Sequence, residues 1–221
     1  MNASDLELSD VEVRVLGSLV EKDITTPDYY PLSLNALVNA CNQKNNRDPV
    51  MALDEDRVRQ ALGSLSGKRL VGPAGGADSR VAKYEHRLQE AFNFDRRETA
   101  LLCMLFLRGP QTLGELRSRS ERMYHFETLD DVQSVLERLM HRDPALVKVL
   151  ARQPGTKEAR YTHLFSPNAG DDSSVAMATP AVSSAGGRLE DTVSALERQV
   201  ASLREEINEL RSELREFKSQ F

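Results

Sequence analysis

Six consecutive hydrogen-bonding side chains follow an apolar stretch with helical spacing and precede Pro49. These residues, which we call the polar loop, are Asn42, Gln43, Lys44, Asn45, Asn46 and Arg47. Asparagine and glutamine can read the edge of adenine, and lysine and arginine can hold phosphate. The same residue types also satisfy backbone groups of their own loop or of a neighbouring domain. The sequence leaves three roles open: nucleic-acid contact, structural loop or contact with a protein partner.

Further candidate DNA contacts lie in the predicted helices and in two turn-rich stretches. They are Arg57, Arg59, Gln60, Arg80, Lys83, Arg117, Arg119, Arg122, Arg152, Lys157 and Arg160. The segments "SRVAK" and "TKEAR" place cations at matching sites of an internal repeat, which favours phosphate contact there. Acidic clusters at 54–56 and 130–131 act against it, because carboxylates repel phosphate. Acidic helices of this kind also suit domains that bind proteins and never touch DNA.

The motifs of common enzymes are absent from the sequence. "PAGGAD" lacks the Lys-Ser/Thr of a phosphate-binding loop, and neither G-x-S-x-G nor H-E-x-x-H occurs. The two acidic clusters are interpreted as helix N-caps. His86 and His163 each follow a tyrosine by two residues, which indicates a repeated structural role. We expect Cys41 and Cys103 to be buried thiols, and no Cys/His spacing in the sequence indicates a zinc site. We therefore expect no cofactor, no metal and no enzymatic activity.

The first 168 residues contain one plan of elements twice. Helices are predicted around "DVEVRVLGSLVEKD" and "FDRRETALLCMLFLRG", each with an N-cap followed three residues later by glutamate. A second helix follows in "LSLNALVNAC" and in "QTLGELRSRS". The third helices align at an offset of 74 residues, which pairs Val58, Leu62 and Leu65 with Val132, Leu136 and Leu139.

Each third helix leads into a turn and a short β-like segment. Glycine and proline mark the turns, and Tyr84-x-His86 matches Tyr161-x-His163 at an offset of 77. Three helices followed by a β-hairpin are typical of a winged helix. The predicted fold is mainly α with small β wings (α+β). We expect a winged-helix domain at 1–92, a second at 93–167, a flexible linker at 168–187 and a coiled-coil helix at 188–221.

Three long segments resemble the YceH-like family of uncharacterised bacterial proteins built from tandem winged helices. They are "LGSLVEKDITTPDYYPLSLNALVNACNQKNNRDPVM", "RGPQTLGELRSRSER" and "VLARQPGTKEARYTHLF". The resemblance covers about residues 6–167. It implies the fold and a bacterial origin, and it transfers no functional residue to this chain.

The C-terminal segment has an apolar seam at alternating spacings of four and three. Its residues are Leu189, Val193, Leu196, Val200, Leu203, Ile207, Leu210, Leu214 and Phe217. Mostly β-branched residues at a, with mainly leucine at d, favour a parallel two-stranded coil. We therefore predict a parallel homodimer. The alternative is a single amphipathic helix folded back on its own domains.

The chain has a net charge of −5, but the charge is uneven. Residues 93–168 hold 12 Lys/Arg against 10 Asp/Glu, and both flanking parts are net negative. No apolar run approaches the roughly 20 residues that span a bilayer, and the acidic N-terminus is unlike a signal peptide. We expect a cytoplasmic protein that does not contact membranes. The leading hypothesis is a transcriptional regulator binding double-stranded DNA; the alternative is a scaffold that binds other proteins.

Overall fold

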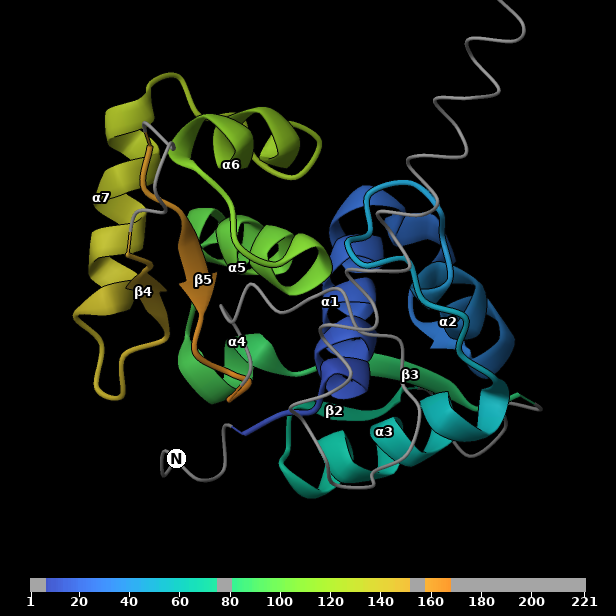
Figure 1. Ribbon diagram of the computed structural model, residues 1–221. Helices are drawn as coiled ribbons and strands as arrows, with labels where there is room; N and C mark the ends of the chain where they lie inside the picture. The colour runs from blue at the N-terminus through green and yellow to red at the C-terminus, as the bar shows by residue number, and fades with distance from the viewer. Residues whose placement is uncertain (1–6, 75–80, 152–157, 168–221) are drawn as a thin grey trace, which may run out of the picture. The chain divides into compact units, whose positions relative to one another are not determined.

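The computed structural model describes residues 7–74, 81–151 and 158–167 (Figure 1). The chain divides into two compact units, Met1–Ser174 and Val175–Phe221, and every described residue belongs to the first. The predicted linker at 168–187 and the coiled-coil helix at 188–221, with its nine seam residues, lie outside the described residues. So do three predicted DNA contacts, Arg80, Arg152 and Lys157.

The first half of the described chain has three α-helices and a three-stranded antiparallel sheet. In chain order the elements are α1 (Asp10–Thr25), the 3-10 helix η2 (Pro27–Tyr29), β1 (Leu32–Ser33), α2 (Leu34–Cys41), α3 (Glu55–Gly67), β2 (Val71–Ala74) and β3 (Lys83–His86). The strand order is β1-β3-β2, with Leu32 opposite Tyr84 and Val71 opposite His86. A short helix, α4 (Leu88–Phe92), leads onward.

The second half repeats this order of elements. It contains α5 (Arg96–Arg108), α6 (Leu113–Ser120), α7 (Leu129–Met140), β4 (Val147–Val149) and β5 (Tyr161–His163). Gln111 forms an isolated bridge with Tyr161, at the place where β1 pairs with β3 in the first half. Helices with small antiparallel sheets confirm the predicted α+β class.

Local side-chain bonds start the helices where the sequence predicts. Ser9 with Glu12 and Asp95 with Glu98 form capping boxes at α1 and α5. Asp54 accepts from the backbone N–H of Arg57 and so caps α3. In α7 the capping box joins Thr128 and Asp131. Carboxylates from both acidic clusters therefore serve as helix caps, as predicted.

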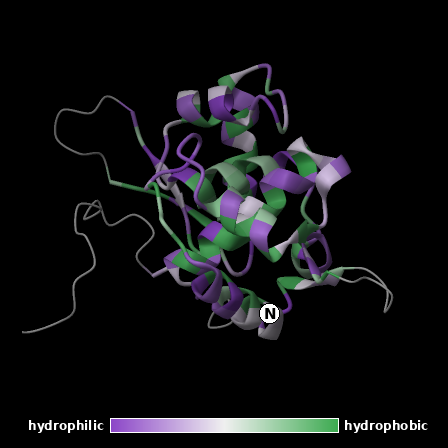
Figure 2. Cartoon of the chain, turned by 90° about the vertical axis from the view of Figure 1, so that its right-hand side faces the viewer, coloured by the Kyte–Doolittle hydropathy of each residue, from purple (hydrophilic) through white to green (hydrophobic). Residues whose placement is uncertain are grey.

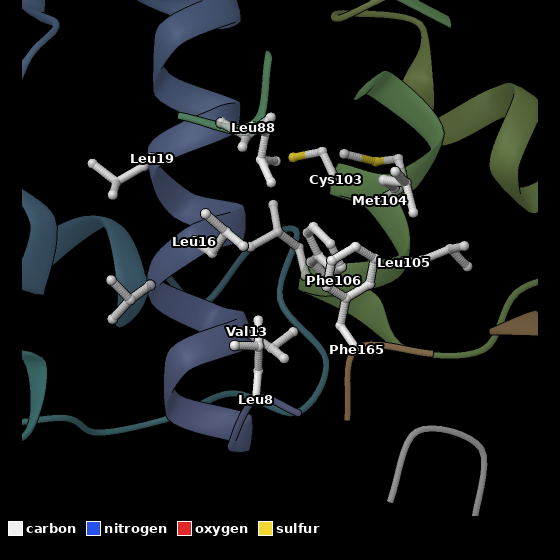
Figure 3. Packing of buried hydrophobic residues seen from close by; sticks show 14 of the residues in the cluster. Leu8, Val13, Leu16, Leu19, Leu88, Cys103, Met104, Leu105, Phe106 and Phe165 are labelled. Atoms are coloured by element: carbon white, nitrogen blue, oxygen red, sulfur yellow. The ribbon is translucent and has the colours of Figure 1, made fainter. Parts of the chain in front are cut away.

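The two halves meet where α1 packs against α5. A methyl group added at Gly17 of α1 would lie 2.9 Å from Cβ of Phe106, so the helices approach closely because Gly17 has no side chain. Figure 3 shows Leu16 and Phe106 facing this space, with Phe165 beside them. One cluster of buried hydrophobic residues runs through both halves. Helices of this unit are hydrophobic on one side and hydrophilic on the other (Figure 2).

Both cysteines and both strand histidines have structural surroundings. Cys41 and Cys103 are buried, and burial raises the pKa of each thiol. His86 and His163 use the same bond, because Nδ1 of each accepts from the backbone N–H two residues later, at 3.4 and 3.3 Å. This shared geometry agrees with the repeated structural role that the sequence indicates. In the described parts of the chain, every helix is too short or too polar to cross a membrane.

Candidate nucleic-acid interface

The polar loop joins α2 to α3, and Arg47 anchors it in the protein interior. Only 4% of Arg47 is exposed. Its Nη2 donates to Oε2 of Glu21 at 2.6 Å and to the carbonyl of Ala40 at 2.8 Å, while Nη1 donates to the other Glu21 oxygen at 3.2 Å. The expectation that Arg47 holds phosphate is corrected here, because its charge is already paired and its guanidinium does not reach the surface.

Two amide side chains complete this anchoring. Asn42 Nδ2 donates to the carbonyl of Leu53 at 2.7 Å, and Oδ1 accepts from the N–H of the same residue at 2.7 Å. Asn42 thus uses both ends of its amide to close the loop and is not free to read a base edge. Gln43 Oε1 accepts from Arg47 at 3.1 Å and from Lys22 at 3.4 Å. Half of the polar loop therefore has the structural role that the sequence left open.

A second buried arginine, Arg14 of α1, lies beneath the same loop. It donates to the carbonyls of Cys41 at 3.3 Å and Pro49 at 2.6 Å. Burial, followed by the nearby charge of Arg47, lowers its pKa to about 10. The sequence does not single out Arg14, because its neighbours on the helix surface include Asp10, Ser18 and Glu21, as expected for a polar face.

The loop also reaches the second half of the chain. The backbone N–H of Asp48 donates to the carbonyl of Leu107, near the end of α5, at 2.9 Å. The segment that links α2 to α3 is therefore bonded to α1, α2 and α5. The members of the polar loop that remain exposed are Lys44, Asn45 and Asn46. Asn46 has a positive φ of 60°, a conformation that asparagine adopts more readily than most residues.

The outward side of α3 is the clearest surface for a partner with phosphates. Arg57, Arg59 and Gln60 are all exposed there. Within the described part of the chain, the ion pair of Arg59 is a long, solvent-exposed one with Glu55, at 3.7 Å. A methyl group added at Gly63 or Gly67 would meet no atom of another described element within 4 Å. This face therefore has hydrogen-bond donors in the first turns of the helix and small residues in the last turns.

Several predicted contacts of the second half are already bonded within the fold. Arg117 Nε donates to the carbonyl of Phe126 at 3.1 Å. Arg119 donates to Gln111 at 3.0 Å and pairs with Glu115 at 3.0 Å. Arg122 is exposed and Arg160 is half-buried. Arg117 and Arg119 thus have structural contacts that an interface would have to share.

Helix α7 differs from α3 in charge and in position. Its exposed residues include Asp130, Asp131 and Glu137. Helix α3 packs on α1, and α7 packs on α5. The two third helices therefore lie on opposite sides of the α1–α5 pair (Figure 1). The predicted contacts do not form one surface, because the α3 face and Lys83, which is exposed at the start of β3, belong to the first half.

Metal chemistry has no candidate in the parts of the chain that the structure describes. Among those residues no group of three or more His, Cys, Asp or Glu side chains is placed to hold an ion. His163, the most buried histidine, packs edge-on against Phe106, and burial lowers its pKa to about 4. The candidate site is therefore the outward side of α3, with exposed Arg57, Arg59 and Gln60.

Comparison with known proteins identifies a family model that matches this chain and several proteins similar to it. A family model described as "protein of unknown function, DUF480" matches residues 8–156. A UPF0502 protein of Koribacter versatilis is 64% identical over 162 residues, which cover 73% of this chain and 75% of the relative. One from Citrifermentans bemidjiense is 62% identical over 161 residues, covering 72% and 74%. One from Solibacter usitatus is 50% identical over 192 residues, covering 87% and 90%.

Proposed function

This chain belongs to the DUF480 family, the YceH-like group of uncharacterised proteins. We propose that it is a tandem winged-helix regulator that binds double-stranded DNA through α3. The observation that carries the proposal is the outward face of α3, where exposed Arg57, Arg59 and Gln60 precede two glycines with open space above them. In winged helices the third helix enters the major groove. Arginine and glutamine there can donate to base edges and phosphates.

The low relief of α3 supports close approach to the groove. Gly63, Ser64 and Gly67 are exposed and small, so the end of the helix can approach a duplex without side-chain collision. The paired strands β2 and β3 support a second contact, because Lys83 is exposed opposite Ala74, where β2 ends and β3 begins. The carboxylates of Glu55 and Asp56 at the first turn would repel phosphate, so the arginines that follow them must supply the attraction.

In this proposal one chain offers a single DNA-binding third helix, α3, whose two arginines stand against the carboxylates of Glu55 and Asp56. The exposed side of α7 is acidic and lies across the α1–α5 pair from α3, so the two do not contact the same stretch of duplex. A dimer through the predicted coiled coil at 188–221 would supply a second α3. The proposed binding site is then a pair of half-sites related by symmetry. Light scattering should give a dimer, and Leu203→Asp combined with Leu210→Asp should give a monomer.

Fluorescence anisotropy on labelled random duplex DNA, from about 20 to 200 mM salt, tests the proposal. Neutralising phosphates releases counterions, so the affinity should fall steeply with salt. The double variant Arg57→Gln, Arg59→Gln should weaken binding and lower the salt slope by about 2. The matched control is Arg96→Gln with Arg97→Gln, two exposed arginines at the start of α5 that are not among the candidate DNA contacts. It should change the slope less.

A substitution at Gly63 separates DNA contact from stability. Gly63→Leu adds bulk where the fold has open space, so the helix should be stabilised by roughly 0.8 kcal/mol from propensity alone. The same side chain should keep α3 from approaching the major groove closely and should weaken DNA binding about tenfold. Gly114→Leu in α6, which also has open space, is the control and should leave DNA binding unchanged. Wild-type protein without affinity for DNA at about 20 mM salt would overturn the proposal.

A protein scaffold is the second candidate, favoured by α7. Asp130, Asp131 and Glu137 are exposed on that helix, and Leu129 beside them is 45% exposed. An acidic face with an exposed leucine suits a basic protein partner better than DNA. The variant Asp130→Lys, Glu137→Lys separates the candidates. It should abolish capture of a specific protein partner if the scaffold reading holds, and it should not weaken DNA binding.

A further inference from the structure

A depression of about 740 Å³ lies where the end of α3, strand β2 and helix α4 meet. We call it the Arg87 pocket. Its polar lining includes Lys68, Arg69, Arg87 and Glu90, and its apolar lining includes Val71 and Pro73. The lining also includes Ser66 and Gly67 at the end of α3, so the pocket adjoins the face proposed for DNA, but Arg57, Arg59 and Gln60 are not part of it. The pocket size is within the range of small-molecule sites, roughly 300–1,000 Å³.

Arg87 is held in place by its contact with Gly72. A methyl group added at Gly72 would lie 2.4 Å from Nε of Arg87, so the guanidinium rests directly on the bare backbone of β2. The Nε atom is buried and has no hydrogen-bond partner among the described residues. Packing rather than hydrogen bonding therefore fixes this end of the side chain. A positioned arginine loses less entropy when it binds a ligand.

Among the residues that the structure describes, the outer edge of the guanidinium makes two long ion pairs. Nη2 of Arg87 is 3.7 Å from Oε1 of Glu85, and Nη1 is 4.0 Å from Oε2 of Glu90. Both distances exceed hydrogen-bond length. The side chain of Glu90 is 71% exposed, so water screens that pair strongly. The Nη groups thus keep donor capacity for an anion with two oxygens.

The charge of the lining is positive although the chain is negative. Lys68, Arg69 and Arg87 stand against Glu90, a balance of +2, whereas the whole chain carries −5. Lys68 is partly used, because its Nζ donates to the carbonyl of Glu7 at 2.6 Å and pairs with Glu12 at 3.0 Å. Arg69 is exposed. The two arginines are therefore the main charges available to a ligand.

We propose that the Arg87 pocket binds a small organic oxyanion. A phosphate or carboxylate group would accept paired hydrogen bonds from Nη1 and Nη2 of Arg87, the geometry that guanidinium favours. Arg69 would add charge, and Val71, Pro73 and Ala91 would contact an apolar part of the same molecule. This binding does not depend on the proposed DNA function, since the donors proposed for DNA, Arg57, Arg59 and Gln60, do not line the pocket.

Isothermal titration of the full-length protein, without DNA, tests this site. The probes are phenyl phosphate and benzoate in separate titrations, at constant ionic strength with sodium chloride. The probe that binds more tightly identifies the oxyanion. Arg87→Gln should weaken binding roughly tenfold or more, because a charge-assisted pair is lost. Gly72→Ala should also weaken it, by displacing the guanidinium. Lys148→Gln, an exposed cation on β4, should bind as wild type does.

Glu90→Gln should change the affinity in the opposite direction from Arg87→Gln. Loss of folding cannot explain an increase in affinity. The substitution removes an exposed carboxylate that competes for Arg87, so it should tighten binding about threefold. Tightening here with weakening in Arg87→Gln supports the site. The proposal is overturned if wild-type protein binds neither probe, if Arg87→Gln binds as tightly as wild type, or if Glu90→Gln leaves affinity unchanged. DNA affinity plays no part in these readouts, so the two proposals fail separately.

Discussion

Nη2 of Arg47 lies 2.6 Å from Oε2 of Glu21, although 26 positions separate the two residues. The side chain of Arg47 is fully buried and that of Glu21 is 10% exposed. Burial raises the pKa of Glu21, but the bond to Arg47 and its charge outweigh burial and leave the pKa below its ordinary value. This pair makes the polar loop part of the folded core and fixes it to α1.

Replacing Arg47 should destabilise the protein strongly. Arg47→Met removes the buried partner of the Glu21 carboxylate and leaves it the ion pair with Lys22 at 3.4 Å; breaking a buried pair typically costs about 3–5 kcal/mol. The double variant Glu21→Leu, Arg47→Met removes both charges and should recover much of that loss. Urea unfolding followed by circular dichroism measures both. Arg122→Met, at an exposed site, is the control and should change stability by less than about 0.5 kcal/mol. A comparable loss in that control would refute a special role for the buried pair.

Asn42→Ala should also destabilise the protein, but less. It removes both bonds to the backbone of Leu53, leaving a buried residue with an unpaired N–H. The expected loss is about 1–3 kcal/mol. Chemical unfolding checks the value, with Asn45→Ala on the exposed part of the loop as control. Hydrogen exchange at the Leu53 amide should accelerate in Asn42→Ala and stay unchanged in Asn45→Ala. Unchanged protection in both would contradict the role of Asn42.

Gly17→Ala should weaken the packing of the two halves. The added Cβ would lie 2.9 Å from Cβ of Phe106 and 3.0 Å from Cδ2 of Leu107, so α1 and α5 must move apart. Overpacking of this kind costs about 1–3 kcal/mol, even though alanine is the better helix former. Gly63→Ala in α3, where space is open, should instead stabilise by roughly 0.5–1 kcal/mol. Thermal melts of the two variants should shift in opposite directions.

Stability should fall as the pH drops from 6.5 to 5, because of His163. Burial lowers its pKa to about 4 in the folded protein, against an ordinary value of 6.5. Between these values the unfolded chain binds more protons, so stability rises with pH. The change between pH 5 and 6.5 should be about 1.5 kcal/mol. His163→Asn should flatten this slope, and His125→Asn, at an exposed site, should retain it. An equal slope in wild type and His163→Asn would exclude His163 as its source.

The elements of the fold were predictable because their signals are local. The capping residues Ser9 and Asp95 lie within three positions of their partners, and the apolar spacing of each helix falls within a few turns. The matching Tyr-x-His segments gave the two strands, because their repetition is visible in the sequence. Family membership was also predictable from long segments of the chain, and the comparisons confirm it.

The role of the polar loop was not predictable from sequence in the same way. Arg47 stands in a run of polar residues beside Asp48 and Pro49, which is typical of a solvent-exposed turn. Its partner Glu21 lies on α1, 26 positions earlier, so no local spacing connects them. A polar run offers the same donors to phosphate, to base edges and to buried carbonyls. Only the tertiary structure determines which of these groups the donors contact.

The close approach of α1 and α5 has a consequence for how the unit unfolds. Gly17 brings Phe106 against α1, the Asp48 N–H bonds to α5, and one hydrophobic cluster runs through both halves. Opening either half would expose core surface of the other. Despite its internal repeat, the unit should therefore melt as a single cooperative species, with calorimetric and van't Hoff enthalpies that agree.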